Sequence, residues 1–286
     1  MIAVTGATGH LGKLAVETLL NKGTKASEII AVVRNKGKAQ DLVSKGIAVR
    51  EADYGNAESL TKALQGVEKL LFISGSEAGQ RVPQHTNVIN AAKKAGVKFV
   101  AYTSILKADT SKMILAKEHL VTENLIKDSG IHHAFLRNGW YIENYTEQFG
   151  NTLKSGVIAG AAQNGKISAA TRSDYAAAIV AVIRNPPAKN ATYELGGDAF
   201  TLTELAALTS KVSGKKIEYK DMPAPDYSKL LASFGVPQGF ADILADSDEG
   251  IVRGDLYTTS DDLKKLIGRP LTSLEEAVKK AVQANS

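Results

Sequence analysis

The segment Val4-Thr5-Gly6-Ala7-Thr8-Gly9-His10-Leu11-Gly12 joins an expected strand to an expected helix at the start of this 286-residue chain. In such a loop the first glycine permits a tight turn, the second leaves room for a pyrophosphate, and the third lets the helix pack closely on the sheet. The main-chain amides at the helix start and the helix dipole both favour a doubly negative group. The segment therefore predicts a dinucleotide site formed by Gly6, Ala7, Thr8, Gly9, His10, Leu11 and Gly12.

Short apolar runs alternate with amphipathic stretches through the first half of the chain. The expected strands are residues 2–5, 29–34, 48–51, 69–73, 99–103 and 132–136, and the expected helices are residues 11–21, 38–44, 57–64, 84–95 and 113–129. This alternation, with strands apolar on both faces, indicates a parallel sheet covered by helices on both sides. We expect an α/β fold: a doubly wound parallel sheet of the Rossmann type with a smaller C-terminal substrate lobe.

The alternation breaks after Trp140, where glycines and short segments follow one another. The expected elements are strands 157–159, 167–169 and 192–195 and helices 174–184 and 202–212. Capping boxes formed by Thr201 with Glu204 and by Thr272 with Glu275 predict two helix starts. We expect a dinucleotide-binding core over residues 1–148, rejoined by about residues 187–200, and a smaller, interleaved substrate lobe over residues 149–286.

Composition excludes several kinds of site. The chain has no cysteine, which excludes disulfides, thiolate nucleophiles, zinc–thiolate sites and iron–sulfur clusters. The adjacent histidines His132 and His133 lie in an expected strand, so they point to opposite faces and cannot bind one metal ion. We expect no metal site.

Charge and hydropathy bear on partners and location. The chain has 35 basic and 30 acidic residues, without a dense basic block, which argues against a nucleic-acid partner. The longest apolar run, residues 176–183, is too short to span a bilayer, and residues 2–4 read as a buried strand rather than part of a signal peptide. We therefore expect a cytoplasmic protein with no membrane partner.

The residue that ends the second expected strand distinguishes between two cofactors. An acidic residue there accepts hydrogen bonds from the ribose hydroxyls of NAD, whereas this chain has Arg34, followed by Asn35 and Lys36. A guanidinium matches phosphate oxygens in charge and geometry, although a solvated basic loop is the plain alternative. Arg34 therefore favours NADP over NAD.

Two further segments follow strands at the edge where doubly wound sheets bind ligands. Ser74, Gly75 and Ser76 follow the fourth strand and supply small residues and hydroxyls beside a nucleotide. Asn138, Gly139, Trp140 and Tyr141 follow the sixth strand and offer an amide and two aromatic rings for a nicotinamide and a pocket wall. Core packing is an equally good explanation of the two rings.

These segments resemble the NmrA-like group of atypical short-chain dehydrogenases/reductases, and within it the quinone-reductase branch and the triphenylmethane reductases. The segments that carry the likeness are residues 5–12, 31–35, 53–54, 71–75, 101–104, 136–144, 171–176 and 193–197, so it covers nearly all of the chain. The resemblance implies a Rossmann fold, NADPH as the cofactor and a small-molecule quinone as the acceptor.

One departure from related carbonyl reductases concerns their Tyr-x-x-x-Lys pair. Glu123 matches the glutamate that commonly follows this pair, which places His119 at the lysine position and Leu115 at the tyrosine position. Leucine cannot donate a proton, so ordinary alcohol dehydrogenation is disfavoured. Ser76 and His119 are candidates for a remaining catalytic role, and the catalytic residues are otherwise unassigned.

The basicity of the product decides which acceptors tolerate this loss. Hydride addition to a ketone builds an alkoxide whose conjugate acid has a pKa near 16, as bulk water does. Addition to a quinone builds a phenolate-like anion with a pKa of about 10. The difference of about six pKa units corresponds to about 8 kcal/mol less demand on the protein. A quinone can therefore be reduced without a positioned enzymic acid.

The sequence thus predicts an NADPH-dependent quinone reductase that transfers a hydride directly and needs no flavin, because it has one glycine loop. The alternative is a non-catalytic NADP-binding redox sensor that regulates a protein partner, which the lost tyrosine fits equally well. A sugar-nucleotide epimerase is weakened by the same loss. The oligomeric state stays open.

Overall fold

A single parallel sheet dominates residues 1–77 and 79–285, the part of the chain that the computed structural model describes. Its seven strands lie in the order β3-β2-β1-β4-β5-β6-β8. They are β1 (Ile2–Thr5), β2 (Ile29–Val33), β3 (Ala48–Glu51), β4 (Lys69–Phe72), β5 (Phe99–Ile105), β6 (His132–Asn138) and β8 (Ala191–Leu195). β1 pairs in parallel with both β2 and β4, so the strand order reverses at β1. This confirms the expected doubly wound α/β fold.

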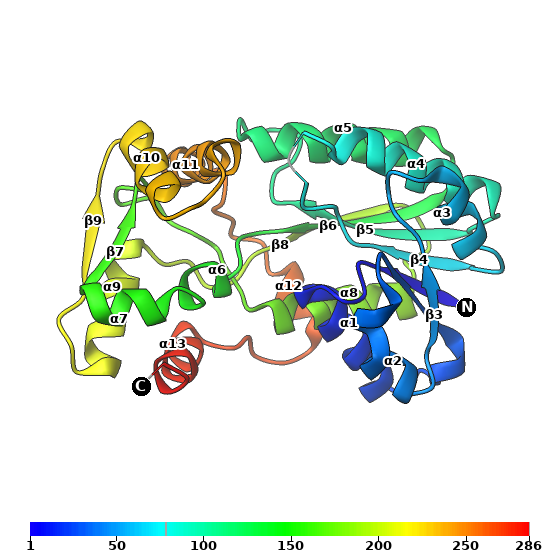
Figure 1. The fold of residues 1–286 in the computed structure, drawn as a ribbon, viewed down its shortest axis with the longest axis horizontal. Helices are drawn as coiled ribbons and strands as arrows, with labels where there is room; N and C mark the ends of the chain where they lie inside the picture. Colours follow the sequence, from blue (N-terminus) through cyan, green and yellow to red (C-terminus); the bar gives the residue numbers. More distant parts are fainter. Residues whose placement is uncertain (78, 286) are drawn as a thin grey trace. The chain divides into compact units, whose positions relative to one another are not determined.

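Helices cover both faces of the sheet. They are α1 (His10–Asn21), α2 (Gln40–Ser44), α3 (Ala57–Ala63), α4 (Arg81–Lys94), α5 (Ile114–Asp128) and α8 (Arg172–Arg184), with short 3-10 turns at Ala26–Glu28 and Lys36–Ala39. Helices α3, α4 and α5 lie on one face, and α1, α2 and α8 on the other (Figure 1). All five residues of β2 are buried, as a strand covered on both sides requires.

The chain falls into two compact units. Unit 1 comprises Met1–Ser104, Glu118–Arg137 and Arg172–Tyr193, and unit 2 comprises Ile105–Lys117, Asn138–Thr171 and Glu194–Ser286. Residues 105–117 and 138–148 thus group with unit 2, and α8 groups with unit 1. The division into domains near residue 148 stays a prediction.

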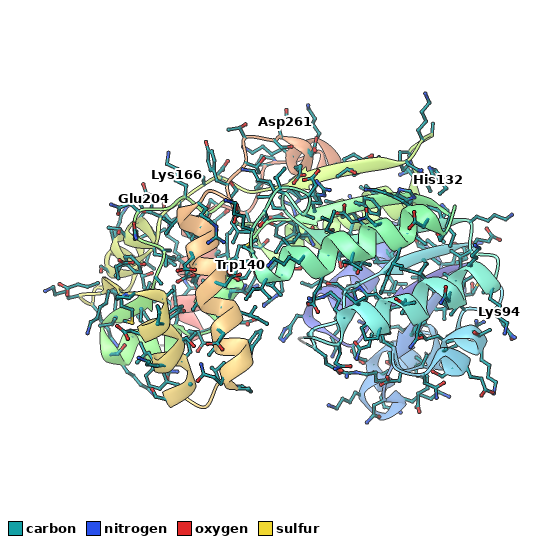
Figure 2. The ribbon with its side chains drawn as sticks, turned by 90° about the horizontal axis from the view of Figure 1, so that it is seen from above. Lys94, His132, Trp140, Lys166, Glu204 and Asp261 are labelled. Atoms are coloured by element: carbon teal, nitrogen blue, oxygen red, sulfur yellow. The ribbon has the colours of Figure 1, made fainter. Side chains whose placement is uncertain are left out.

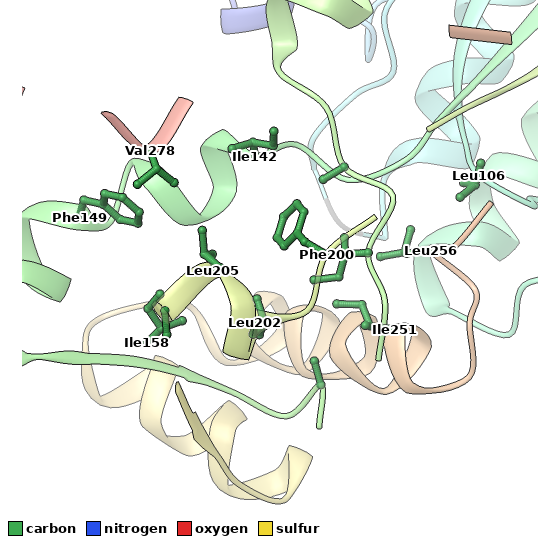
Figure 3. Packing of buried hydrophobic residues seen from close by; sticks show 14 of the residues in the cluster. Leu106, Ile142, Phe149, Ile158, Phe200, Leu202, Leu205, Ile251, Leu256 and Val278 are labelled. Carbon is green, nitrogen blue, oxygen red and sulfur yellow. The ribbon is translucent and has the colours of Figure 1, made fainter. Parts of the chain in front are cut away.

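Unit 2 combines a small sheet with a helical cluster. Its elements are α6 (Glu143–Thr146), α7 (Phe149–Ser155), β7 (Val157–Gly160), α9 (Leu202–Ser213), β9 (Glu218–Asp221), α10 (Ala224–Ser233), α11 (Gln238–Val252), α12 (Asp262–Ile267) and α13 (Leu274–Gln283). β7 and β9 pair in parallel. Side chains such as Phe200, Leu205 and Leu256 form its buried core (Figure 3). Their burial gives unit 2 a hydrophobic core of its own.

Two local predictions in unit 2 were wrong, and one strand was missed. The last helix is capped by Ser273 with Glu276, one residue after the expected pair Thr272 and Glu275, because the Ser/Thr-x-x-Glu pattern occurs in both registers. In the expected strand 167–169, Ile167 alone forms an isolated antiparallel bridge, with Phe200. β9 was not expected, because its sequence Glu-Tyr-Lys-Asp is polar and largely exposed.

Candidate functional site

A cavity of about 740 Å³ in unit 1 lies where the sheet's strand order reverses. Its walls follow the carboxyl ends of β1, β2, β3 and β4, the place where doubly wound sheets bind ligands. The lining residues are Gly6, Thr8, Gly9, His10, Leu11, Gly12, Val32, Val33, Arg34, Asn35, Lys38, Ala52, Asp53, Tyr54, Ile73, Ser74, Gly75, Ser76, Glu77 and Gln84. The structure therefore brings together the glycine loop, Arg34 and residues 74–76.

The glycine loop adopts the geometry that its sequence predicts. Gly6 has a φ of +60°, in the left-handed region that favours glycine. A Cβ atom at Gly12 would lie 2.2 Å from the carbonyl oxygen of Gly6, so only glycine permits this approach of α1 to the loop. Ala7 is fully buried beneath the loop and does not line the cavity. The first and third glycines thus fix the backbone that forms this wall of the cavity.

The start of α1 can bind an anion. Gly9 precedes the helix without a side-chain cap, and no acidic residue lies in the first turn. Among the described residues, none accepts a hydrogen bond from the main-chain amides of residues 10–12. Uncapped amides at a helix start bind phosphate groups well, because they add to the positive end of the helix dipole. A pyrophosphate fits this position.

Arg34 directs its guanidinium to Glu77 across the lining of the cavity. Nη1 donates to Glu77 Oε1 at 2.5 Å, and Gln84 Nε2 donates to the other carboxylate oxygen at 2.6 Å. Both partners are exposed, with 64% of the Arg34 side chain and 47% of the Glu77 side chain accessible. An exposed pair of this kind is weak, so a phosphate dianion can replace the carboxylate.

The segment Asn138–Tyr141 belongs to unit 2 and is not part of the lining of the unit 1 cavity. The Asn138 side chain is buried, and neither its amide nitrogen nor its oxygen has a partner among the described residues. A buried amide without partners is costly, so these two atoms suit a ligand with both donor and acceptor groups. Gly139 donates its main-chain N–H to the carbonyl of Leu195 at 2.7 Å.

The two rings of this segment differ in their surroundings. Trp140, which Figure 2 labels, is partly buried and packs against the hydrophobic core of unit 2. Tyr141 pairs with Ala170 in an isolated parallel bridge. Packing thus explains part of the role of Trp140, whereas a cofactor contact by either ring stays a prediction.

His119 lies inside unit 1. Its Nδ1 shares a hydrogen bond of 2.7 Å with the hydroxyl of Tyr102, and only 6% of the residue is exposed. Burial, with a smaller contribution from the charge of Arg81, lowers the pKa of His119 well below its usual value. The ring is therefore neutral at physiological pH, and a neutral imidazole is a poor acid. This disfavours His119 as the proton donor, although a hydrogen-bonding role stays open.

Glu123 and Arg137 form a buried ion pair. Arg137 Nε and Nη2 donate to the two carboxylate oxygens at 2.9 and 2.8 Å, and Ser104 Oγ donates to Oε1 at 2.6 Å. The Arg137 side chain is 6% exposed and the Glu123 side chain is 0% exposed. Each charge is thus compensated by a bidentate partner, which a buried pair requires. Glu123 consequently has a structural role that ties α5 to β5 and β6.

A second cavity, of about 1070 Å³, lies entirely within unit 2. Its apolar wall comes mainly from β7, Met222 and α10, and its aromatic residues are Tyr145, Tyr227 and Phe234. Asp248 is buried next to these tyrosines and accepts a hydrogen bond from the amide of Ala161 at 2.7 Å. Burial raises the pKa of Asp248 to about 7. The size and lining of this cavity suit an apolar small molecule.

Several residues around the first cavity were not among those expected. Tyr54, Asp53, Lys38, Glu77 and Gln84 line it. The position of Asp53 and Tyr54 directly after the third strand was the available signal, since residues after parallel strands share one sheet edge. Glu77 and Gln84 carried no such signal, because they reach the cavity from the loop after β4 and the first turns of α4.

The described part of the chain contains no helix long and apolar enough to cross a membrane. It also contains no group of three or more His, Asp or Glu residues arranged to hold a metal ion.

The model of the NmrA-like family matches residues 1–281. The chain belongs to the NmrA-like family. It is 55% identical to quinone oxidoreductase 2 of Escherichia coli (strain K12) over 287 residues, with both chains covered completely. This confirms the predicted family.

Two solved structures are closely similar to this chain. One is the complex with NADPH of the NADPH-dependent quinone oxidoreductase from Escherichia coli, with a TM-score of 0.94 and 56% identity over 98% of this chain and 99% of that one. The other is the triphenylmethane reductase of Citrobacter sp. complexed with NADP(H), with a TM-score of 0.92 and 43% identity over 98% of this chain and 100% of that one. Both carry the same fold over their full length.

Proposed function

We propose that this chain is an NADPH-dependent quinone oxidoreductase. The observation that carries the proposal is its 55% identity, over the full length, to an enzyme named for this activity. One of the two similar solved structures holds NADPH. The cavity at the glycine loop and Arg34 at the end of β2 support the same cofactor in this chain.

The residues that line the cavity of unit 1 fit the adenosine and pyrophosphate parts of NADPH. The amides at the start of α1 bind the pyrophosphate, and Arg34 exchanges Glu77 for the 2′-phosphate of the adenosine ribose. Ser74, Gly75 and Ser76 lie beside the nucleotide. The segment Asn138–Tyr141 binds the nicotinamide, with the buried amide of Asn138 satisfied by the carboxamide.

Bound NADPH would supply a hydride, which delivers two electrons to the quinone. One further proton, taken from water, completes the hydroquinone, so atoms and charge balance. No residue of the chain has to act as a strong acid, because the anion formed from a quinone is only weakly basic. Leu115 and the neutral His119 are compatible with this acceptor and incompatible with an ordinary ketone. Direct transfer without flavin is part of the proposal.

The acceptor binds to unit 2, in the cavity bounded by β7 and α10. Apolar side chains there cover a ring, and Tyr227 brings a hydroxyl to the lining. That hydroxyl can donate a hydrogen bond to a quinone carbonyl. We also propose a cytoplasmic location and no nucleic-acid partner.

The experiment is steady-state oxidation of NADPH by the purified protein with p-benzoquinone, after its absorption spectrum has shown that no flavin is bound. Sustained turnover supports the proposal. Tight binding of NADPH without turnover with any quinone would instead favour the NADP-binding sensor. Turnover that depends on added flavin would overturn direct hydride transfer.

A further inference from the structure

Side chains from several elements hold the main chain of residues 73–75, which lines the nucleotide cavity. The Ile73 amide donates to Thr5 Oγ1 at 3.0 Å, and its carbonyl accepts from the Tyr54 hydroxyl at 2.7 Å. The Ser74 amide donates to Thr103 Oγ1 at 2.9 Å. This segment belongs to no helix or strand, so side chains satisfy the hydrogen bonds that secondary structure supplies elsewhere.

Two residues of α4, Arg81 and His85, bind the amide and the carbonyl of Gly75. The Gly75 amide donates to His85 Nε2 at 2.9 Å, and the Gly75 carbonyl accepts from Arg81 Nη2 at 2.9 Å and from Arg81 Nε at 3.2 Å. Arg81 and His85 are four residues apart, so they lie on the same face of the helix. They are 5% and 0% exposed.

The bond from Gly75 determines the protonation of His85. A main-chain amide can only donate, so Nε2 must accept and the proton lies on Nδ1. Nδ1 then donates to Thr122 Oγ1 at 2.9 Å, and the Thr122 hydroxyl donates to the carbonyl of Glu118, also at 2.9 Å. Burial keeps the ring neutral by lowering the pKa of His85 to about 3. Every donor in this chain of bonds has an acceptor.

Helix α5, which contains Thr122 and Glu118, also holds Arg81. Arg81 Nη1 forms an ion pair with the carboxylate of Glu118, which is itself largely buried. The guanidinium therefore holds a carboxylate and the Gly75 carbonyl at once. In residues 73–75, every main-chain amide donates to a side chain, and the Ser74 carbonyl is the one carbonyl that accepts no hydrogen bond from a described residue.

We propose that Arg81 and His85 are positioning residues of the dinucleotide site, which set the Gly75 peptide so that the Ser74 carbonyl is free to accept a hydroxyl of the cofactor ribose. The inference rests on the proposed cofactor. It assigns a role in cofactor binding to two buried side chains that lie behind the cavity wall rather than on it. The neutral imidazole is required because a protonated Nε2 cannot accept from Gly75.

The test compares NADPH dissociation constants for two substitutions of His85. In His85→Gln the amide oxygen can still accept from the Gly75 N–H, so the dissociation constant should stay within about threefold of the wild-type value. His85→Leu leaves that N–H without an acceptor, and the dissociation constant should rise about five- to tenfold. Rescue by glutamine would not follow from a purely space-filling role.

His133→Leu is the matched control, because His133 is also buried in unit 1 but bonds to Ile131 rather than to the cavity wall. This control should lower the unfolding midpoint and leave NADPH affinity unchanged. If His85→Leu does not fold, Thr122→Val provides the second variant, since it removes the acceptor that fixes the tautomer and should weaken NADPH binding at least twofold.

Wild-type affinity in His85→Leu, or in Thr122→Val where the first variant fails to fold, would overturn the inference. So would equal weakening by His133→Leu. These outcomes are separate from failure of the proposed function, which would show as no NADPH binding by the wild-type protein or as binding without quinone turnover.

Discussion

Arg34 and Glu77 form an ion pair of 2.5 Å between two residues that line the nucleotide cavity. The guanidinium proposed to bind the 2′-phosphate is therefore engaged by a carboxylate of the same chain. A cofactor with this phosphate has to replace Glu77, whereas NADH does not. The pair thus ties cofactor selection to a competition between two anions for one cation.

Removing the competing charge should strengthen NADPH binding. In Glu77→Gln the side chain keeps its size and can still accept a hydrogen bond from Gln84, but it no longer neutralises Arg34. Because exposed pairs contribute at most about 1 kcal/mol, the dissociation constant for NADPH should fall about two- to fivefold. NADH affinity should not change, and fluorescence titration with both cofactors measures the difference. Weaker NADPH binding in this variant would show that Glu77 supports the site instead.

Removing the cation should have the opposite effect. A charge-assisted contact to phosphate contributes about 1.5–3 kcal/mol, so Arg34→Ala should weaken NADPH at least about tenfold and NADH far less. Lys36→Ala is the control. It also removes one positive charge, and Lys36 is two residues from Arg34 but does not line the cavity. Equal losses for NADPH and NADH in Arg34→Ala would assign this residue a structural role.

Two glycines of the same loop should respond differently to a methyl group. A Cβ at Gly9 would lie 3.2 Å from the Gly6 carbonyl oxygen, a close contact that a small adjustment relieves. Gly9→Ala should therefore fold with an almost unchanged midpoint yet lose most of its stabilisation by NADPH, since the methyl group occupies space that the pyrophosphate needs.

Gly12→Ala should instead lower the midpoint of the apoprotein by about 3–9 °C, because its Cβ would lie 2.2 Å from a main-chain oxygen. Thermal unfolding with and without NADPH separates the two effects. A large cofactor-dependent shift in Gly9→Ala would contradict the assignment of this loop.

Asp248 should make stability depend on pH. Burial raises its pKa from 3.8 to about 7, so the folded chain retains a proton that the unfolded chain has already released. Stability therefore falls as pH rises from about 4 to 7. Asp248→Asn keeps an acceptor for the Ala161 amide and removes this dependence, so at pH 8 it should gain about 1–4 kcal/mol in the free energy of unfolding. Urea unfolding at pH 5 and pH 8 tests this, and an equal effect at both pH values would exclude titration of Asp248.

The sequence predicted the central strands β1 and β2 well because both are runs of apolar, buried residues. The edge strand β3, with the sequence Ala-Val-Arg-Glu, was also predicted although it is partly exposed. β1 and β3 have the expected bounds, and β2 ends one residue earlier than expected. The glycine loop was predicted from its glycines, since the φ of Gly6 favours glycine and the contact at Gly12 leaves no room for a Cβ atom.

Interactions between distant residues could not be predicted in this way. Helix α4 begins at Arg81 rather than Gln84, and the buried charge of Arg81 is compensated by Glu118, which is 37 residues away in the sequence. The bond of His85 to Gly75 and the pairing of Arg34 with Glu77 also depend on tertiary structure. Polar side chains give no periodic pattern that reveals such partners.

Direct hydride transfer to a quinone can be tested by comparing the rates of NADPH oxidation with p-benzoquinone and with cyclohexanone, at saturating NADPH and with flavin-free protein. We expect sustained turnover with the quinone and almost none with the ketone, because Leu115 and a neutral His119 supply no acid for an alkoxide. Comparable turnover of cyclohexanone would contradict it, since an enzymic proton donor would then have to be present.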